Sequence, residues 1–181
     1  LGDVYEDILN IGRIFDVEQR ASEIVDAMQR MVAGLDEDLA GVKPLKVFVY
    51  DQSNREEAFT AGLSLESTVI RLAGGINVFE SIPSHFATVS WSRVEESKPD
   101  AILVHRFYSE EDAQAKTGCL LRRRELREVP AIRHKRIFSV RLSHMFPGIH
   151  NAEMVRWLAS MLHPERVGNF SPSDDIRFPS L

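Results

Sequence analysis

The chain has 181 residues, of which 44% are hydrophobic and 27% are charged, and its net charge is -5. This length suits one ordinary domain with its own core, and this composition excludes a disordered chain. The acidic balance disfavours nucleic acid as a partner, the single cysteine excludes an internal disulfide, and no apolar run reaches the roughly 18 residues of a transmembrane helix.

The first 40 residues are predicted to be helical. Residues 3–11 form a short helix that Gly12 closes. Asp16, with a glutamine three residues later, resembles a capping box and predicts the start of a second helix. Apolar residues then recur at helical spacing as far as Leu39, which predicts a rod of about 22 residues and roughly 33 Å. Such a helix suits either a spine between two lobes or ordinary packing.

Strand and helix patterns alternate along the rest of the chain. Strands are expected at residues 46–50, 76–79, 101–104 and 137–142, and helices at residues 64–72, 92–97, 109–127 and 151–162. Residues 51–62 are expected to form a loop, and Pro130 to stop the third of these helices. This alternation predicts an α/β fold, a Rossmann-like lobe with a parallel sheet flanked by helices.

The predicted strands end in aromatic and basic residues. Because parallel strands present their carboxyl ends at one edge of a sheet, these side chains are expected to gather around a ligand. Aromatic walls with a few arginine and histidine side chains suit a bulky, partly anionic ligand. The candidate ligand-binding residues are Tyr50, Phe59, His85, Phe86, Arg106, Tyr108, Arg141, His144 and Phe146.

Motifs for other chemistries are missing from the sequence. No glycine-rich phosphate loop follows the first strand, and Gly74-Gly75 is expected to supply a positive φ at a helix end. There is no Gly-x-Ser-x-Gly motif, and no histidine pair has the helical zinc spacing. We therefore expect no catalytic residue, no metal site and no cofactor.

Two other functions stay open at this level. One is a small α/β enzyme, which requires Asp51 to contact a histidine at the sheet edge, namely His85, His105 or His144. The other is an interaction module that uses the basic run of residues 122–136. Glutamates interrupt that run and no aromatic residues interleave with it, so a solvated surface is the preferred interpretation.

Several short segments, in their order, resemble one family. They are Phe59–Gly62, Ala73–Phe79, Pro99–Ile102, Val129–Ile132, Arg136–Phe138, Pro147-Gly148, Asn151–Glu153 and His163–Glu165. This chain resembles the C-terminal lobe of the substrate-binding proteins that serve ABC importers of iron–siderophore, haem and vitamin B12. The resemblance implies the end of a first lobe at residues 1–15 and a connecting helix at 16–40. It further implies a ligand-binding lobe at 41–165, followed by a tail at 166–181.

The resemblance also implies a function, which is non-enzymatic. We expect capture of a ferric siderophore or a related chelate, with cobalamin or haem as alternative ligands, and delivery to an ABC permease outside the cytoplasm. The location is the periplasm or a lipid anchor on the outer face of the cytoplasmic membrane. An N-terminal part is expected to precede Leu1, and a homodimer is an option through the lobe face left exposed.

The permease contact implied by the resemblance departs from the family pattern. The family usually has a glutamate shortly after the Val-Ser step, and that place is Ser92 here. Glu95 or Glu96, one helical turn further on, is the expected substitute. These three residues are therefore the candidates for permease docking.

Overall fold

A parallel four-stranded sheet forms the centre of the molecule in a computed structural model that describes residues 1–171. Its strand order is β4 (Gly75–Asn77), β1 (Leu45–Tyr50), β6 (Ala101–Arg106) and β7 (Ile137–Arg141). The predicted α/β fold with a parallel sheet is confirmed. Residues 172–181 of the predicted tail lie outside the described part of the chain.

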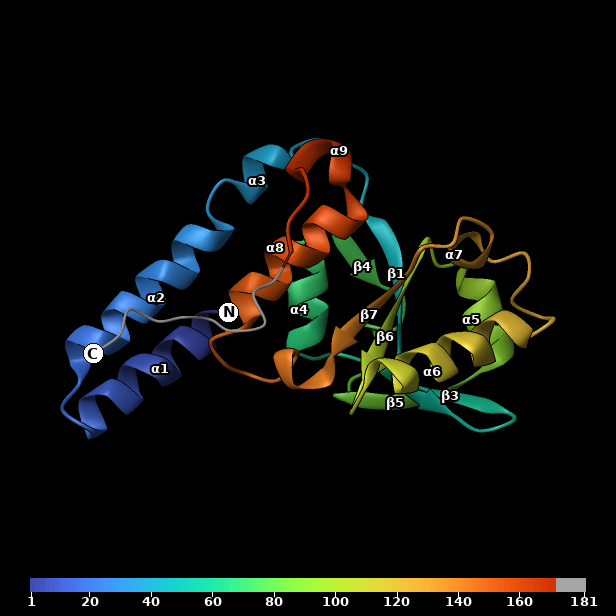
Figure 1. Cartoon of the computed structure of the whole chain (residues 1–181), viewed down its shortest axis with the longest axis horizontal. Helices are drawn as coiled ribbons and strands as arrows, with labels where there is room; N and C mark the ends of the chain where they lie inside the picture. Colours follow the sequence, from blue (N-terminus) through green and yellow to red (C-terminus); the bar gives the residue numbers. More distant parts are fainter. Residues whose placement is uncertain (172–181) are drawn as a thin grey trace.

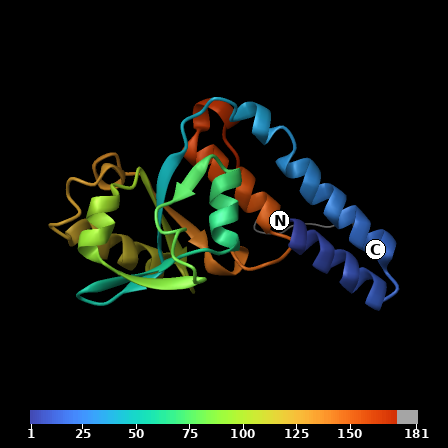
Figure 2. The same cartoon turned by 180° about the vertical axis from the view of Figure 1, so that it is seen from behind.

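Helices cover both faces of this sheet (Figures 1 and 2). On β1, Val47 and Val49 enter the core beneath α4 (Leu65–Leu72) and α8 (Asn151–Leu162). Phe48 alternates with them and enters a second core beneath α5 (Trp91–Ser97) and α6 (Glu110–Arg122). Because successive side chains of a strand point to opposite faces, a continuous apolar run fills two cores at once.

A second sheet was not predicted. It is antiparallel and joins β2 (Gln52–Ser53), β3 (Glu57–Ala61) and β5 (Phe86–Ser90). The expectation of a loop at 51–62 is therefore wrong. Asn54 explains the tight turn between β2 and β3, because its side-chain oxygen accepts from the backbone N–H groups of Glu56 and Glu57, both at 2.8 Å.

The N-terminal region is a helical hairpin that projects from the lobe (Figure 1). It consists of α1 (Gly2–Ile14) and α2 (Glu18–Val32). The predicted 22-residue rod is too long: α2 has 15 residues, and Gly34, at φ +85°, precedes the short α3 (Leu35–Asp38). Gly12 lies inside α1, where it packs against Ala21 of α2.

Three further boundaries differ from expectation. Asp16 is not an N-cap; it has φ +55° in the hairpin turn, and Val17 precedes α2. The helix predicted at 109–127 ends at Arg122, and Pro130 begins α7 (Pro130–Arg133), where a residue without a backbone N–H costs nothing. The short helices η1 (Leu142–His144) and α9 (Pro164–Val167) follow β7 and α8.

Gly74 has φ +78°, as predicted, and connects α4 to β4. None of the helices in residues 1–171 combines the length and apolar character that a membrane span needs.

Candidate functional site

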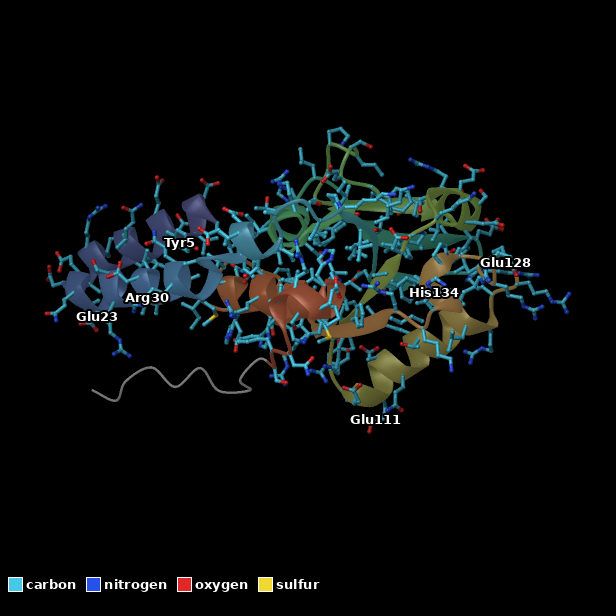
Figure 3. The ribbon with its side chains drawn as sticks, turned by 90° about the horizontal axis from the view of Figure 1, so that it is seen from above. Tyr5, Glu23, Arg30, Glu111, Glu128 and His134 are labelled. Atoms are coloured by element: carbon cyan, nitrogen blue, oxygen red, sulfur yellow. The ribbon has the colours of Figure 1, made fainter. Side chains whose placement is uncertain are left out.

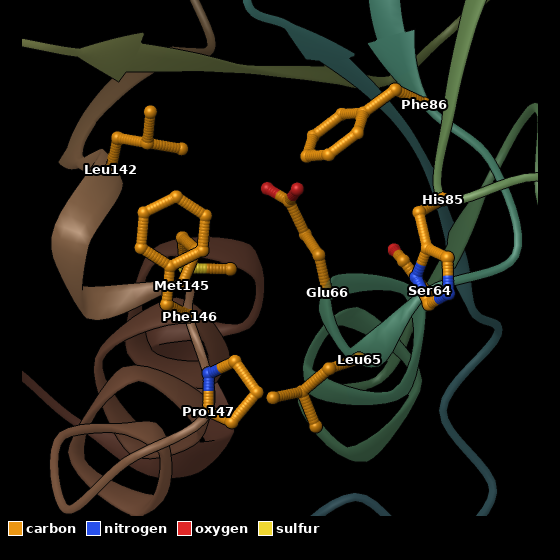
Figure 4. A pocket seen from close by; sticks show the side chains of 9 residues that line it. All are labelled: Ser64, Leu65, Glu66, His85, Phe86, Leu142, Met145, Phe146 and Pro147. Atoms are coloured by element: carbon orange, nitrogen blue, oxygen red, sulfur yellow. The ribbon is translucent and has the colours of Figure 1, made fainter.

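A pocket of about 190 Å³ opens beyond the carboxyl end of β7 (Figure 4). One wall comes from the start of α4 and the start of β5, and the other from the loop that follows β7. The lining residues are Ser64, Leu65, Glu66, His85, Phe86, Leu142, Met145, Phe146 and Pro147. Complete ligand pockets usually measure about 300–1,000 Å³. The cavity is therefore large enough for part of a sizeable ligand.

A buried asparagine fixes the wall at α4. The side-chain amide of Asn77 donates to the Ala61 carbonyl at 2.8 Å and to Ser67 Oγ at 2.9 Å. Ser67 in turn donates to the Gly62 carbonyl at 2.7 Å. Gly62 is required here, because a Cβ would collide with the Ser84 carbonyl oxygen. These bonds join the end of β3, the end of β4 and the first turn of α4.

A second buried asparagine fixes the opposite wall. Asn151, at the start of α8, donates to the carbonyls of His144 at 3.0 Å and Phe146 at 2.8 Å. Its side-chain oxygen accepts from the Gly148 N–H at 2.8 Å. The loop that carries Phe146 is thus held by a side chain with full hydrogen bonding, which orders the loop before a ligand arrives.

Behind the pocket, His105 at the end of β6 bridges two carboxylates. Its Nε2 lies 2.7 Å from Glu66 Oε1, and its Nδ1 lies 2.9 Å from Asp51 Oδ1. Burial acts to lower the pKa of His105, but the charge of Glu66 and the hydrogen bonds to both carboxylates raise it to about 9. Because this pKa lies above neutral pH, the fully buried ring is an imidazolium that joins Glu66 to Asp51.

The enzyme alternative required Asp51 to contact a histidine, and His105 meets that condition. The chemistry of a catalytic dyad is nevertheless missing at this histidine. A general base needs a ring nitrogen that can take a proton from substrate. Both nitrogens of His105 are bonded to carboxylates, and the ring has no exposed surface. The geometry is that of a buried ionic cluster.

The other two histidines lie apart from this cluster. His85 is exposed and lines the pocket. His144 stacks on His150 with ring centroids 4.3 Å apart. Burial lowers the pKa of His144, and the neighbouring His150 and Arg141 lower it further. Within residues 1–171 no group of three or more histidine, cysteine or acidic residues could hold a metal ion.

Residues 1–141 match the periplasmic binding protein family. This chain belongs to that family. No curated protein matches the chain significantly.

Solved structures of periplasmic binding proteins share the fold. One from Veillonella parvula is 25% identical, with a TM-score of 0.83 over 88% of this chain and 56% of that chain. An ABC-type Fe3+-hydroxamate transport protein from Saccharomonospora viridis is 21% identical, with a TM-score of 0.77 over 89% of this chain and 55% of that chain. A periplasmic heme-binding protein from Roseiflexus is 18% identical, with a TM-score of 0.75 over 90% of this chain and 62% of that chain. The chain therefore spans little more than half the length of these relatives.

Three of the ligand-binding residues predicted for this periplasmic binding protein line the pocket: His85, Phe86 and Phe146. Phe86 and Phe146 face each other across the cavity from opposite walls (Figure 4). They are 57% and 52% exposed, an uncommon exposure for phenylalanine. The structure thus brings together an aromatic pair from β5 and from the loop after β7, 60 residues apart in the sequence.

The remaining candidates lie outside the pocket. Tyr50 is buried in the second core and bonded to Ser53 Oγ at 2.7 Å, so its expected contact with a ligand is not available in this structure. Phe59 lies on β3, Tyr108 is 92% exposed after β6, and Arg106 pairs with Glu110. Arg141 ends β7, and His144 lies in η1 within the loop that follows.

The candidate docking residues of this binding protein share one surface. Ser92, Glu95 and Glu96 are all exposed on α5, on the lobe face away from the hairpin (Figure 1). Ser90 caps that helix by accepting from the Arg93 N–H at 3.4 Å.

Glu66 was not predicted from the sequence. An acidic residue in the first turn of a helix is common, because it interacts favourably with the helix dipole. Nothing in the sequence connects it to Asp51 or His105, which lie on other elements. The available signal was His105 itself, a polar residue that directly follows the apolar residues Ala101–Val104 of β6.

Proposed function

We propose that this chain is the ligand-binding C-terminal lobe of an extracytoplasmic protein that captures a ferric siderophore-type chelate for an ABC importer. The observation that carries the proposal is the aromatic pocket beyond the parallel sheet, in a chain of the periplasmic binding protein family. Its volume of about 190 Å³ fits one side of a chelate, which agrees with a ligand held between two lobes.

Related structures support this ligand class. Among the similar folds are a protein described as part of an Fe3+-hydroxamate transport system and another described as heme-binding. Two facing phenylalanines also suit a flat macrocycle, so haem or cobalamin is the second candidate. A role in catalysis is not part of the proposal, since the family and these neighbours are binding proteins and His105 has no free nitrogen.

Delivery to an ABC permease through α5 remains a prediction. Glu95 and Glu96 are exposed there and supply the acidic charge that Ser92 lacks. A lipid anchor and a homodimer formed through the exposed lobe face likewise remain predictions.

The function is tested by titrating the protein with a ferric trihydroxamate, haem and cobalamin while the fluorescence of Trp91 and Trp157 is recorded. We expect saturable quenching by at least one of them. Phe86→Ala and Phe146→Ala should each weaken binding about tenfold, because each removes apolar contact area. Leu121→Ala, which trims an exposed apolar side chain on α6 away from the pocket, is the matched control. A flat titration with all three ligands would refute the proposed function.

A further inference from the structure

One carboxylate stands in an apolar pocket. Of the nine lining residues, all within the described range 1–171, Glu66 alone is acidic. Figure 4 shows its carboxylate pointing into the space between Phe86 and the loop that carries Phe146. The side chain is only 6% exposed, so it lies at the floor of the cavity. A carboxylate in such surroundings is costly unless it is paired.

The protein supplies a hydrogen-bond partner to only one of the two oxygens of that carboxylate. Oε1 lies 2.7 Å from His105 Nε2, whereas no residue in the described part of the chain donates to Oε2. A carboxylate has about four lone-pair sites, and a buried one is normally hydrogen-bonded at both oxygens. Oε2 therefore remains available to a donor that enters the pocket.

The ionic cluster also carries uncompensated charge. An imidazolium between two carboxylates leaves a net charge of -1. Within residues 1–171 the ion pairs of Asp51 and Glu66 are those with His105. The cations nearby are engaged elsewhere: Lys116 donates to the His105 carbonyl and pairs with Asp112, and Arg106 pairs with Glu110. A cation in the pocket would balance the excess negative charge.

The cluster is built to hold Glu66 in position. Asp51 follows β1, His105 lies near the end of β6, and Glu66 lies in the first turn of α4, so residues from three places in the fold meet here. Asp51 and His105 are positioning residues, because neither lines the cavity. A rigid acceptor discriminates between ligands more sharply than a mobile one, since little entropy is lost on binding.

We infer that Glu66 selects chelates that carry a protonated amine, by accepting a charge-assisted hydrogen bond from an alkylammonium arm that enters the pocket between Phe86 and Phe146. The inference rests on the proposed function, since it assigns a ligand class to the same site. The apolar walls contact the methylene groups of the arm, and Glu66 meets its charged end. The bulk of the chelate stays outside the cavity.

The test compares two ligands that differ in one group. The first is a ferric trihydroxamate with a terminal primary amine, and the second is the same chelate with that amine acetylated. The protein should bind the amine form about tenfold more tightly, the usual worth of a hydrogen bond between charged groups. Equal affinities for the two chelates would overturn the inference and leave the proposed function standing.

Variants connect the preference to Glu66. Glu66→Gln should abolish the preference for the amine form, and Glu66→Asp, which keeps the charge, should retain part of it. Glu128→Gln removes the same charge from an exposed site at the far end of the lobe and should leave the ratio unchanged (Figure 3). A preference that survives in Glu66→Gln contradicts the inference.

The readout is a ratio of two affinities, which a general loss of stability does not alter. If Glu66→Gln fails to fold, the affinities of the unaltered protein for the two chelates still test whether it prefers the amine form. Binding of haem or cobalamin without either trihydroxamate would overturn the inference and leave the second candidate ligand of the proposed function. No binding of any of the four ligands would overturn the proposed function together with it.

Discussion

His105 makes the stability of the lobe depend on pH. Its pKa in the folded protein is raised to about 9, from 6.5 for a free histidine, because the attraction of Glu66 and Asp51 outweighs the effect of burial. A group whose folded pKa is raised stabilises the fold fully below its unfolded pKa and loses that contribution as pH rises through the folded value. We therefore expect the free energy of unfolding to fall by about 3 kcal/mol between pH 6.5 and pH 9.5.

Urea denaturation at several pH values across this window measures the effect. The matched variant is His105→Gln, which keeps hydrogen-bonding capacity and cannot titrate. This variant should be less stable at pH 6.5, and its stability should change much less across the window. A wild-type unfolding energy that is constant between these pH values would show that the ring is neutral in the fold.

Single residues were the hardest part of the site to predict. Phe146 follows from the rule that the carboxyl ends of parallel strands face ligands, because that rule needs only the order of elements. His85 and Phe86 stand at the start of the antiparallel strand β5, and Phe86 was placed in the cleft by the family resemblance. Neither route leads to Glu66, Asn77 or Asn151, since their roles depend on contacts between distant segments. Tyr50 shows the opposite error. A tyrosine at the end of a strand looks accessible, but the antiparallel sheet, which was not predicted, covers it.

Among the secondary-structure elements, the hairpin of α1 and α2 depends on one glycine. Gly12 faces Ala21, and a Cβ on Gly12 would overlap the Ala21 Cβ. Gly12→Ala should therefore push the helices apart and lower the unfolding free energy by about 1–3 kcal/mol, the usual cost of overpacking. Urea denaturation followed by circular dichroism measures it.

Gly118→Ala in α6 is the matched control for this substitution. The new methyl group there meets only the flexible end of Arg122, and alanine has the better helix propensity. This variant should be as stable as the wild type or up to about 1 kcal/mol more stable. If the two alanine variants have the same stability, α1 and α2 do not approach each other closely at Gly12.

Elements with strong local signals were predicted well, and the others were not. β1 and β6 are continuous apolar runs, and such runs indicate buried parallel strands. β2 and β3 are short, with two and five residues, and β3 is stabilised by pairing with β5, which begins 25 residues beyond its end. The break at Ala33-Gly34 was missed because the apolar spacing continues through Leu35 and Leu39, which pack in or against the first core.

At the scale of the whole molecule, the division between residues 1–40 and residues 41–165 stays a prediction. The structure supplies a physical reason to expect two cooperative units. The hairpin has a small core of its own, where Met28 packs with Val4 and with Ala152 of α8. The sheet carries two larger cores that no residue of α1 enters with a buried side chain. Segments that bury little apolar surface open more readily than the core.

Native-state hydrogen exchange distinguishes one unit from two. Met28→Ala should cost about 2–5 kcal/mol locally, so amides of α1 and α2 should exchange at least about 20-fold faster. The amides of β1 and β6 should keep their protection, because they exchange through opening of the sheet. Leu103→Ala, in the central strand β6, is the matched control and should accelerate exchange in the sheet. If Met28→Ala accelerates exchange in β1 and β6 as strongly as in α2, the hairpin and the lobe unfold together, and the boundary near residue 40 is not an energetic one.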